Sequence, residues 1–226
     1  MIRPMSVPEL WIVAGPNGAG KTTLTQRKPI SDLLPDVHLL NPDDKALEIL
    51  RRQGYAGFAH VPADVLRASF HQAAAWVTDR LDWRLRRMEC VCVETVLSTD
   101  KYRAVVEQVG RAGGFVALIY VALRTPDLAC RRVAARVQAG GHDVPVDRVV
   151  ERWHRSLQQL SWFARHVHRF WVFDNSDSDP ARPPALLAEG GSGQVIIQNA
   201  EAIPELAKSL RDFPEPTGQA GGADAP

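Results

Sequence analysis

The sequence has few of the features that mark a secreted, membrane-bound or nucleic-acid-coating protein. Its 226 residues include three cysteines, too few for the disulfide framework of a small secreted domain. Its apolar runs all fall short of the ~20 residues that cross a bilayer. Lys and Arg number 27 against 26 Asp and Glu, and a formal charge of +1 favours neither nucleic acid nor a membrane surface. We therefore expect a cytoplasmic protein with no membrane contact and no general affinity for nucleic acid.

What is present is the composition of an ordinary globular domain. Hydrophobic residues make up 45% of the chain and charged residues 23%, and a chain of 226 residues can bury a proper core. Cys90 and Cys92 lie two residues apart in an apolar run, so we interpret them as small buried side chains in a reducing compartment.

One stretch near the N-terminus indicates a specific chemistry. Residues 15–22 read Gly-Pro-Asn-Gly-Ala-Gly-Lys-Thr, which fits G-x-x-x-x-G-K-[ST], and they directly follow the apolar run 10–14. Glycines allow positive φ, so that successive N–H groups point inward, and the helix that follows adds its unpaired N-terminal donors. The stretch therefore predicts a loop that binds the phosphates of ATP or GTP. Because this loop begins at Gly15, we expect no signal peptide ahead of it.

The side chains of this loop have distinct expected roles. Lys21 is expected to reach the β- and γ-phosphates, and the Thr22 hydroxyl is expected to hold Mg²⁺. The predicted nucleotide-binding set is Gly15, Pro16, Asn17, Gly18, Ala19, Gly20, Lys21, Thr22 and Thr23.

Two later strands are expected to place carboxylates at the same edge of the sheet. Asp43 and Asp44 follow the strand expected at 37–40, and the apolar stretch of the strand expected at 89–95 ends at Glu94. In doubly wound sheets, ligands bind outside the carboxyl ends of the strands. Asp43 and Asp44 either cap the next helix or face the γ-phosphate, and the spacing alone favours neither. Glu94 ends a buried strand, and we interpret it as functional.

A long amphipathic helix is expected over residues 63–87, because apolar side chains recur there at three- and four-residue spacing. Its last turns carry several arginines over residues 80–87. These arginines form either a solvated helix face or a phosphate-binding patch, and the solvated face is the favoured interpretation.

Two helices joined by a glycine hinge are expected after the central strand, residues 115–123. The first carries Arg132 and Arg136 four residues apart on one face. We interpret residues 126–145 as a lid in which these arginines bind phosphate charge. The alternative is a helical hairpin with ordinary surface arginines. His142, just after the hinge, is either a donor to phosphate or a loop residue.

The rest of the chain completes the predicted fold. We expect strands at 170–173 and 195–197, a loop or disordered insertion at 177–193 and a last helix at 203–211. The alternation of strand and helix predicts an α/β fold, a P-loop NTPase three-layer sandwich with a mostly parallel sheet and a helical lid. Residues 1–213 are expected to form this single domain and residues 214–226 a disordered tail.

Six stretches occur in an order that is typical of one family. They are residues 15–22, Leu40-Asn41-Pro42-Asp43, Val93-Glu94-Thr95, Arg132 with Arg136, Gly140-Gly141-His142-Asp143-Val144-Pro145, and Phe173-Asp174-Asn175-Ser176. The series resembles the zeta-toxin-like family of bacterial P-loop kinases over roughly residues 8–176. The resemblance implies ATP and Mg²⁺ as cofactors and transfer of the γ-phosphate to a sugar hydroxyl. For the true zeta toxins the acceptor is UDP-N-acetylglucosamine, and an epsilon antitoxin blocks the ATP site.

The resemblance also implies roles for single residues. Asp43 matches the catalytic aspartate that accepts the proton of the sugar hydroxyl, and Glu94 matches an acidic residue that holds substrate. Arg132 and Arg136 occupy the region of the lid arginines that stabilise the transferring phosphoryl group. The implied catalytic set is Lys21, Asp43, Glu94, Arg132 and Arg136, and the implied substrate-binding set is Asp43, Glu94, Thr95 and His142.

The chain departs from the true toxins at three places. Its loop contains Asn17-Gly18-Ala19 in place of a serine-containing version, Thr95 follows Glu94 in place of glycine, and His142 stands where the toxins carry a second lid arginine. These departures bear on which acceptor the protein uses more than on the type of reaction.

Three functions remain open from the sequence. The leading one is a small-molecule kinase acting on a nucleotide sugar, a candidate toxin with an antitoxin protein as partner. The second keeps the fold and changes the acceptor to a dinucleotide, a nucleoside or a polynucleotide end. The third is an ATPase switch that controls a protein partner. The two carboxylates and the lid arginines favour a kinase over a switch.

Overall fold

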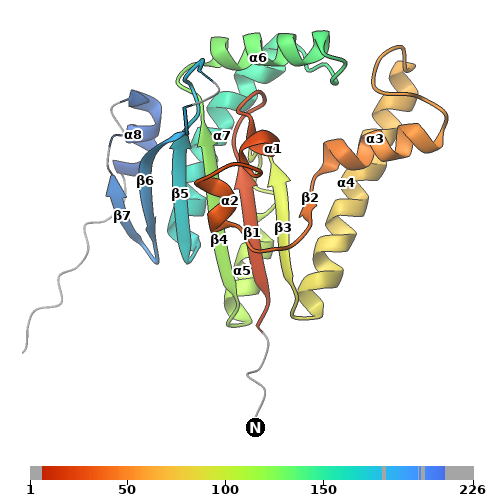
Figure 1. Cartoon of the computed structure of the whole chain (residues 1–226). Helices are drawn as coiled ribbons and strands as arrows, with labels where there is room; N and C mark the ends of the chain where they lie inside the picture. The colour runs from red at the N-terminus through yellow and green to blue at the C-terminus, as the bar shows by residue number, and fades with distance from the viewer. Residues whose placement is uncertain (1–6, 180–181, 198, 200–201, 212–226) are drawn as a thin grey trace, which may run out of the picture.

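The computed structural model describes residues 7–179, 182–197, 199 and 202–211, which form one sheet with helices on both faces (Figure 1). The described strands are β1 (Glu9–Ala14), β2 (Leu39–Leu40), β3 (Cys90–Thr95), β4 (Phe115–Ala122), β5 (Arg169–Asp174), β6 (Ala185–Gly191) and β7 (Gln194–Ile197). They lie in the order β2-β3-β1-β4-β5-β6-β7. β1 to β5 run parallel, whereas β6 and β7 are antiparallel. The predicted α/β class with a mostly parallel sheet is confirmed.

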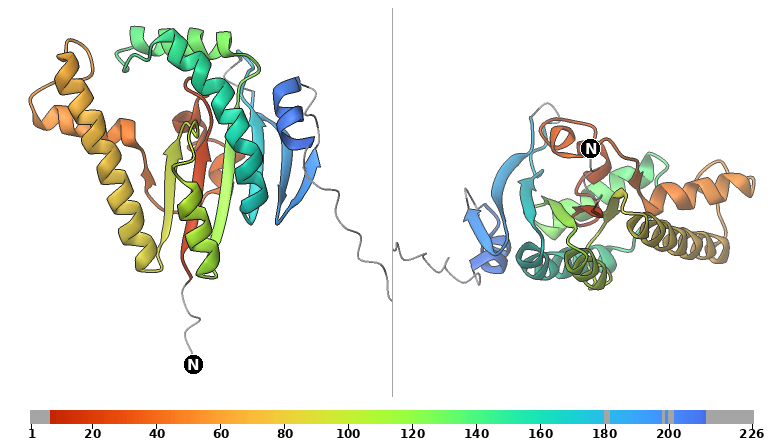
Figure 2. Two further views of the ribbon diagram at one scale, coloured as in Figure 1. Left: turned by 180° about the vertical axis from the view of Figure 1, so that it is seen from behind. Right: turned by 90° about the horizontal axis from the view of Figure 1, so that it is seen from below.

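Helices cover both faces of this sheet and its carboxyl edge. They are α1 (Lys21–Leu24), α2 (Ile30–Leu33), α3 (Pro42–Arg52), α4 (Ala63–Arg86), α5 (Arg103–Arg111), α6 (Pro126–Gln138), α7 (Val146–His166) and α8 (Pro204–Arg211). Figure 2 shows α5 and α7 against one face and α1 and α2 on the other, and α6 crosses the carboxyl edge (Figures 1 and 2). The central strands read as continuous apolar runs because both of their faces are covered; Leu118, Ile119 and Tyr120 of β4 are fully buried.

α4 is the predicted long amphipathic helix. Its buried side carries Ala73, Val77, Leu81 and Leu85 at four-residue spacing. Two of the four arginines near its end pair with neighbouring carboxylates: Arg86 Nε lies 2.8 Å from Asp82 Oδ2, and Arg87 Nε lies 2.8 Å from Glu89 Oε1. These local pairs support the interpretation of a solvated helix face.

The prediction of an irregular segment over residues 177–193 is wrong in its second half, because β6 lies there and pairs with β5. The glycines at its end are strand residues that permit close backbone approach. A Cβ on Gly191 would lie 1.9 Å from the His168 carbonyl oxygen. Residues 180–181 of this segment and the predicted tail 214–226 lie outside the described residues.

The cysteines behave as small apolar side chains. Cys92 is buried and Cys90 is half-buried, and both are free thiols. Burial raises the pKa of Cys90 to about 11 and that of Cys92 to about 12, so both stay protonated at neutral pH.

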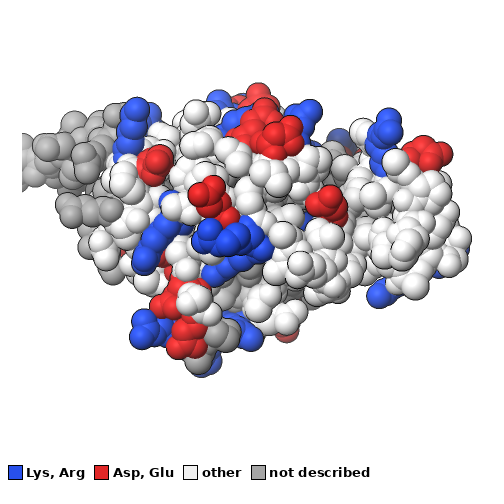
Figure 3. Space-filling model, turned by 90° about the horizontal axis from the view of Figure 1, so that it is seen from above, with Lys and Arg blue, Asp and Glu red and all other residues white. Residues whose placement is uncertain are grey.

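The face above the carboxyl edge carries both signs of charge. Lys and Arg side chains alternate there with Asp and Glu and form no continuous basic track (Figure 3). Among the described helices, none combines the length and apolar character that a membrane span requires.

Candidate functional site

β1 leads directly into the predicted phosphate loop, whose glycines are required by close backbone contacts. Gly15 has φ 144°, and a Cβ there would lie 2.1 Å from the Val121 carbonyl oxygen. Gly18 has φ 75°, and a Cβ there would lie 2.8 Å from the Ala129 carbonyl oxygen of α6. Larger residues would be strained at both positions. The loop is therefore packed between the end of β4 and α6.

Lys21 begins α1 and is buried inside this loop. Its Nζ donates hydrogen bonds to the carbonyl oxygens of Gly15 (2.9 Å) and Pro16 (3.3 Å) and lies 3.9 Å from Glu94 Oε1. Burial lowers the pKa of Lys21, and the charges of Glu94 and Asp43 oppose that shift. The amine is held at the centre of the loop, where a phosphate cradled by the loop N–H groups would meet it.

Glu94 lies beside the loop because β3 pairs with β1 in register, Val13 opposite Glu94. Its Oε2 accepts hydrogen bonds from Thr22 Oγ1 (2.9 Å) and Asn41 Nδ2 (3.2 Å). Burial raises the pKa of Glu94, and Lys21 and Thr22 oppose the shift. The structure thus joins the loop, the end of β2 and the end of β3 through one carboxylate.

The same oxygens form a donor set that fits Mg²⁺. Magnesium prefers hard oxygen ligands and keeps several waters or phosphate oxygens of its own. The Thr22 hydroxyl and the Glu94 carboxylate supply two such oxygens 2.9 Å apart in the phosphate cavity. Across the described ranges, no group of three or more His, Cys, Asp or Glu side chains could hold a metal ion.

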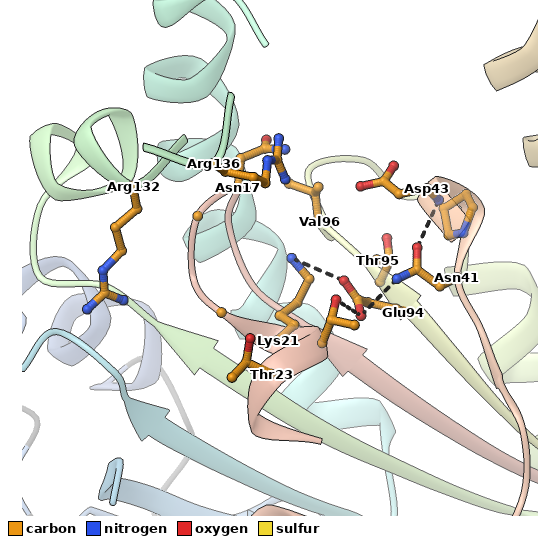
Figure 4. Close-up of a pocket in the computed structure, with 14 residues that line it drawn as sticks. Asn17, Lys21, Thr23, Asn41, Asp43, Glu94, Thr95, Val96, Arg132 and Arg136 are labelled. Atoms are coloured by element: carbon orange, nitrogen blue, oxygen red, sulfur yellow. Dashed lines mark hydrogen bonds and ion pairs between the residues drawn. The ribbon is translucent and has the colours of Figure 1, made fainter. Parts of the chain in front are cut away.

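The Asp43 side chain does not cap α3, because another residue is the N-cap of this helix. Asn41 is the N-cap, and its Oδ1 accepts a hydrogen bond from the Asp43 backbone N–H at 2.8 Å. The two-residue strand β2 ends just before it, shorter than the predicted run 37–40. The Asp43 side chain is 42% exposed and projects toward the cleft (Figure 4). Of the two sequence alternatives for Asp43, capping is therefore excluded.

Two cavities meet at Asp43. The phosphate cavity, of about 360 Å³, is lined by Asn17, Gly18, Gly20, Lys21, Thr22, Thr23, Asn41, Pro42, Asp43, Glu94, Thr95, Val96, Arg132 and Arg136. A second cavity, of about 900 Å³, shares Asn17, Pro42, Asp43 and Val96 with the first. This second cavity extends to α4 and α7, and its wall includes Arg67, His71, His142, Arg148 and Arg152. A carboxylate on the wall common to both cavities can reach groups bound in either.

Arg132 and Arg136, both on α6, point to opposite sides of the loop (Figure 4). Arg132 donates a hydrogen bond to the Asp177 carbonyl oxygen at 2.9 Å and borders a further cavity, of about 270 Å³, beside Asn175. Arg136 lies on the other side, near Asn17 and Val96 (Figure 4). Both line the phosphate cavity, as expected, but they do not converge on one point as a pair.

Sequence reasoning assigned no site role to several residues that reach the site from distant parts of the chain. Asn175, at the end of β5, donates a hydrogen bond from Nδ2 to the Ala19 carbonyl oxygen at 2.8 Å. Arg148 and Arg152 come from α7, and Arg67 comes from α4. The i, i+4 spacing of Arg148 and Arg152 directly after the hinge was a signal for the α7 pair. Arg67 carries no local signal.

The comparisons with known proteins agree with this architecture. Residues 10–160, more than half of the chain, match the family described as AAA domain (AAA_33). No curated protein sequence matches the chain. Among solved structures, the chain is similar to the AvrRxo1-ORF1:-ORF2 complex with ATP, at 16% identity and a TM-score of 0.66, over 95% of this chain and 67% of that one.

Two further solved structures are similar. The AvrRxo1-ORF1:AvrRxo1-ORF2 structure with sulphate ions has 16% identity and a TM-score of 0.66, over 92% of this chain, which spans 66% of the length of that one. The PezAT chromosomal toxin–antitoxin system of Streptococcus pneumoniae has 17% identity and a TM-score of 0.58, over 90% of this chain and 80% of that one. At such identities the likeness concerns the fold, and it confirms the predicted P-loop NTPase architecture.

Proposed function

Because the chain belongs to the AAA domain family (AAA_33), we propose that it is an ATP-dependent phosphotransferase. It transfers the γ-phosphate to a hydroxyl of a nucleotide sugar such as UDP-N-acetylglucosamine. The observation that carries this proposal is the position of Asp43 on the wall shared by the phosphate cavity and the second cavity. We assign the second cavity to the acceptor and call it the acceptor cavity. An ATPase switch binds and hydrolyses ATP without a second substrate, so it needs the phosphate cavity alone.

The donor half of the site holds ATP and Mg²⁺. The loop backbone and Lys21 would bind the phosphates, and the Thr22 hydroxyl and the Glu94 carboxylate would hold the metal. When bound, Mg²⁺ neutralises charge that develops on the phosphate oxygens. Glu94 therefore serves the donor side, and Thr95 lies next to it on the cavity wall. The helix α6 and the hinge, residues 126–145, form the lid of a single domain that includes residues 1–213.

Asp43 acts as the base in this mechanism. Its carboxylate accepts the proton of the acceptor hydroxyl as the hydroxyl oxygen attacks the γ-phosphorus and the bond to the β-phosphate oxygen breaks. ADP leaves with the electron pair of that bond. Phosphoryl transfer depends mainly on positioning and charge stabilisation, so one carboxylate at the junction of two cavities is sufficient for this role.

The acceptor cavity suits an anionic molecule. Arg152 is half-buried on its wall, and no carboxylate within 4.0 Å pairs with it in the described part of the chain. Arg67 and Arg148 lie on the same wall. Guanidinium groups bind phosphate oxygens through paired N–H donors. A volume of about 900 Å³ and three arginines favour an acceptor that carries a diphosphate.

The similar structures support two parts of the proposal. One AvrRxo1 complex contains ATP, which supports ATP as the phosphate donor here. PezAT is a toxin–antitoxin system, and it supports a toxin role with an antitoxin protein as partner. A cytoplasmic location belongs to the same proposal.

The test is transfer of label from γ-labelled ATP, with Mg²⁺, to UDP-N-acetylglucosamine. N-acetylglucosamine without its nucleotide is the matched acceptor. We expect label on the nucleotide sugar and at least tenfold less on the free sugar, since the free sugar cannot contact the arginines. Release of labelled phosphate alone, across a panel of nucleotide-sugar, dinucleotide and nucleoside acceptors, would contradict the kinase and favour the switch.

A further inference from the structure

The turn between α6 and α7 is folded around one arginine. The Gly141 N–H donates to the Arg136 carbonyl oxygen at 2.9 Å, and a Cβ on Gly141 would lie 2.6 Å from Arg136 Cγ. His142 then meets the guanidinium twice: Arg136 Nη2 lies 3.0 Å from the His142 carbonyl oxygen and 3.2 Å from its Nε2. Gly141 thus packs against the aliphatic part of the Arg136 side chain, and His142 binds its guanidinium group.

The orientation of the His142 ring is set from a different part of the fold. Phe58, from the connection before α4, and Phe70, on α4, stack on each other with centroids 5.8 Å apart. The imidazole stands edge-on to both, at 5.3 Å and 5.1 Å. Its side chain is 10% exposed. This packing fixes the ring plane independently of Arg136.

The chemistry of the contact sets the tautomer. A guanidinium N–H can only donate, so Nε2 accepts and the ring proton lies on Nδ1. Burial lowers the pKa of His142, the charges of Arg136 and Arg152 add to this, and Asp43 and Asp143 oppose it. Arg67 and His71 of α4 face the same cavity. The ring is therefore a neutral acceptor at neutral pH.

Arg136 is held at the place where the reaction occurs. His142 Nε2 is 3.7 Å from Asp43 Oδ2, and Arg136 lines the phosphate cavity. Within the part of the chain that the structure describes, Arg136 Nε is buried without a hydrogen-bond partner. Two acceptors of His142 bind one end of the guanidinium, and its Nε–H remains unused. A donor left in this state is available to an anion that enters the site.

From this geometry we propose that His142 is a positioning residue that acts through Arg136. Its carbonyl and its neutral Nε2 hold the guanidinium on the wall of the phosphate cavity, which Asp43 also lines, so that Arg136 meets the phosphoryl group in transfer. The inference rests on the proposed kinase function. It differs from a packing role, in which His142 would only fill the space beside Phe58 and Phe70.

Three substitutions separate positioning from packing. His142→Phe keeps an aromatic ring against Phe58 and Phe70 but cannot accept from Arg136. His142→Gln places an amide oxygen near the position of Nε2. Arg136→Ala removes the group that is positioned. With MgATP and UDP-N-acetylglucosamine, we expect His142→Phe to lower kcat roughly 10- to 100-fold at unchanged KM for ATP and unchanged Tm. His142→Gln should recover most of that loss.

The decisive comparison is the double variant. If His142 acts through Arg136, His142→Phe in the Arg136→Ala background should cause less than a twofold further loss of kcat. A further loss as large as in the wild-type background would overturn the proposal. So would a His142→Phe variant with wild-type kcat.

A spectroscopic readout keeps this inference distinct from the kinase proposal. In ¹⁵N-histidine-labelled protein at pH 7.5, the His142 signal, assigned by its loss in His142→Gln, should show a protonated Nδ1 and an unprotonated Nε2. Arg136→Ala should shift it toward the Nε2–H tautomer. This tautomer signature supports the contact between His142 and Arg136 whether or not any acceptor is phosphorylated. A lack of phosphorylated acceptor would count against the proposed kinase function but not against this contact. A protonated Nε2 in the wild type would overturn the inference whatever the activity.

Discussion

Lys21 and Glu94 are buried charges, and we propose that they are placed for ligand binding rather than for stability. Each is less than a tenth exposed, and their charged atoms lie 3.9 Å apart. Burial disfavours the charged form of both, as the opposite directions of their pKa shifts indicate. Such an arrangement costs stability, and phosphate with Mg²⁺ would offset that cost in the bound state.

Lys21→Ala should abolish turnover and leave the fold intact. The variant loses the cation that meets the transferring phosphate, and we expect ATP consumption to fall at least ~100-fold. Lys28→Ala is the control, because Lys28 is 81% exposed and pairs with Asp32 on the surface. Circular dichroism should show both variants folded. Normal turnover by Lys21→Ala would mean that residues 15–22 are not the phosphate loop.

Glu94→Gln should stabilise the protein at high pH. Since burial raises the pKa of Glu94 above 4.5, the folded protein binds this proton more tightly than the unfolded chain does. Stability is then lost as pH rises from 4.5 through the raised pKa. The variant does not lose stability in this way, so its Tm should exceed that of the wild type at pH 8. The difference between the two Tm values should shrink as the pH falls toward 4.5. Glu48→Gln, at an exposed carboxylate whose pKa is lowered, should show no such gain. A Glu94→Gln Tm equal to or below the wild-type value at pH 8 would refute this explanation.

At the level of elements, hydrogen bonds of two buried hydroxyl groups, those of Ser156 and Tyr120, connect α7 to the sheet. Ser156 Oγ donates to the Val96 carbonyl oxygen at 2.7 Å, and therefore accepts from the Tyr120 hydroxyl at 2.9 Å. Val96 borders both cavities, so this bridge links the site to the interior of the sheet.

Ser156→Ala should destabilise the protein by about 1–3 kcal/mol, because the buried Tyr120 hydroxyl and Val96 carbonyl lose a partner. Urea denaturation measures the change, with Gln158→Ala on the exposed side of α7 as the control. A loss of less than 0.5 kcal/mol would show that the bridge is not a structural anchor. The same variant should raise KM for the acceptor, because α7 also carries Arg152 and a loosened α7 would hold this arginine less firmly on the cavity wall.

Elements with strong local signals could be predicted from the sequence, and elements defined by tertiary contact could not. The loop at 15–22 and the strand that carries Glu94 follow from glycine chemistry and apolar runs. β6 was missed because glycines that permit close strand pairing look like loop glycines. The capping role of Asn41 was also missed, since Asn and Asp are equally good caps and three of them stand near one helix start.

At the scale of the molecule, the acceptor cavity is the feature that sequence could not supply. It forms where α3, α4, the hinge and α7 meet, and these segments are distant in the chain. Arg67 resembles any surface arginine in sequence, and the fold alone brings it to the same wall as Arg152. The order of motifs predicted the reaction type, whereas the acceptor depends on contacts that no local pattern records.

MgATP should stabilise the whole domain. A ligand at 100 times its Kd adds about 2.7 kcal/mol to the free energy of unfolding, which for a chain of this size corresponds to a rise in Tm of roughly 5–10 °C. Differential scanning calorimetry measures the shift, and Lys21→Ala should show little of it. An unchanged wild-type Tm at millimolar MgATP would count against ATP as the ligand.

The most direct test of the account is the pair of wild type and Asp43→Asn, compared for ATP affinity and for transfer of label to UDP-N-acetylglucosamine. Asparagine keeps the shape of the side chain but cannot accept the hydroxyl proton. We predict that ATP affinity stays within about threefold and that transfer falls at least ~100-fold. Transfer by Asp43→Asn at the wild-type rate would contradict the assignment of Asp43 as the base between two cavities.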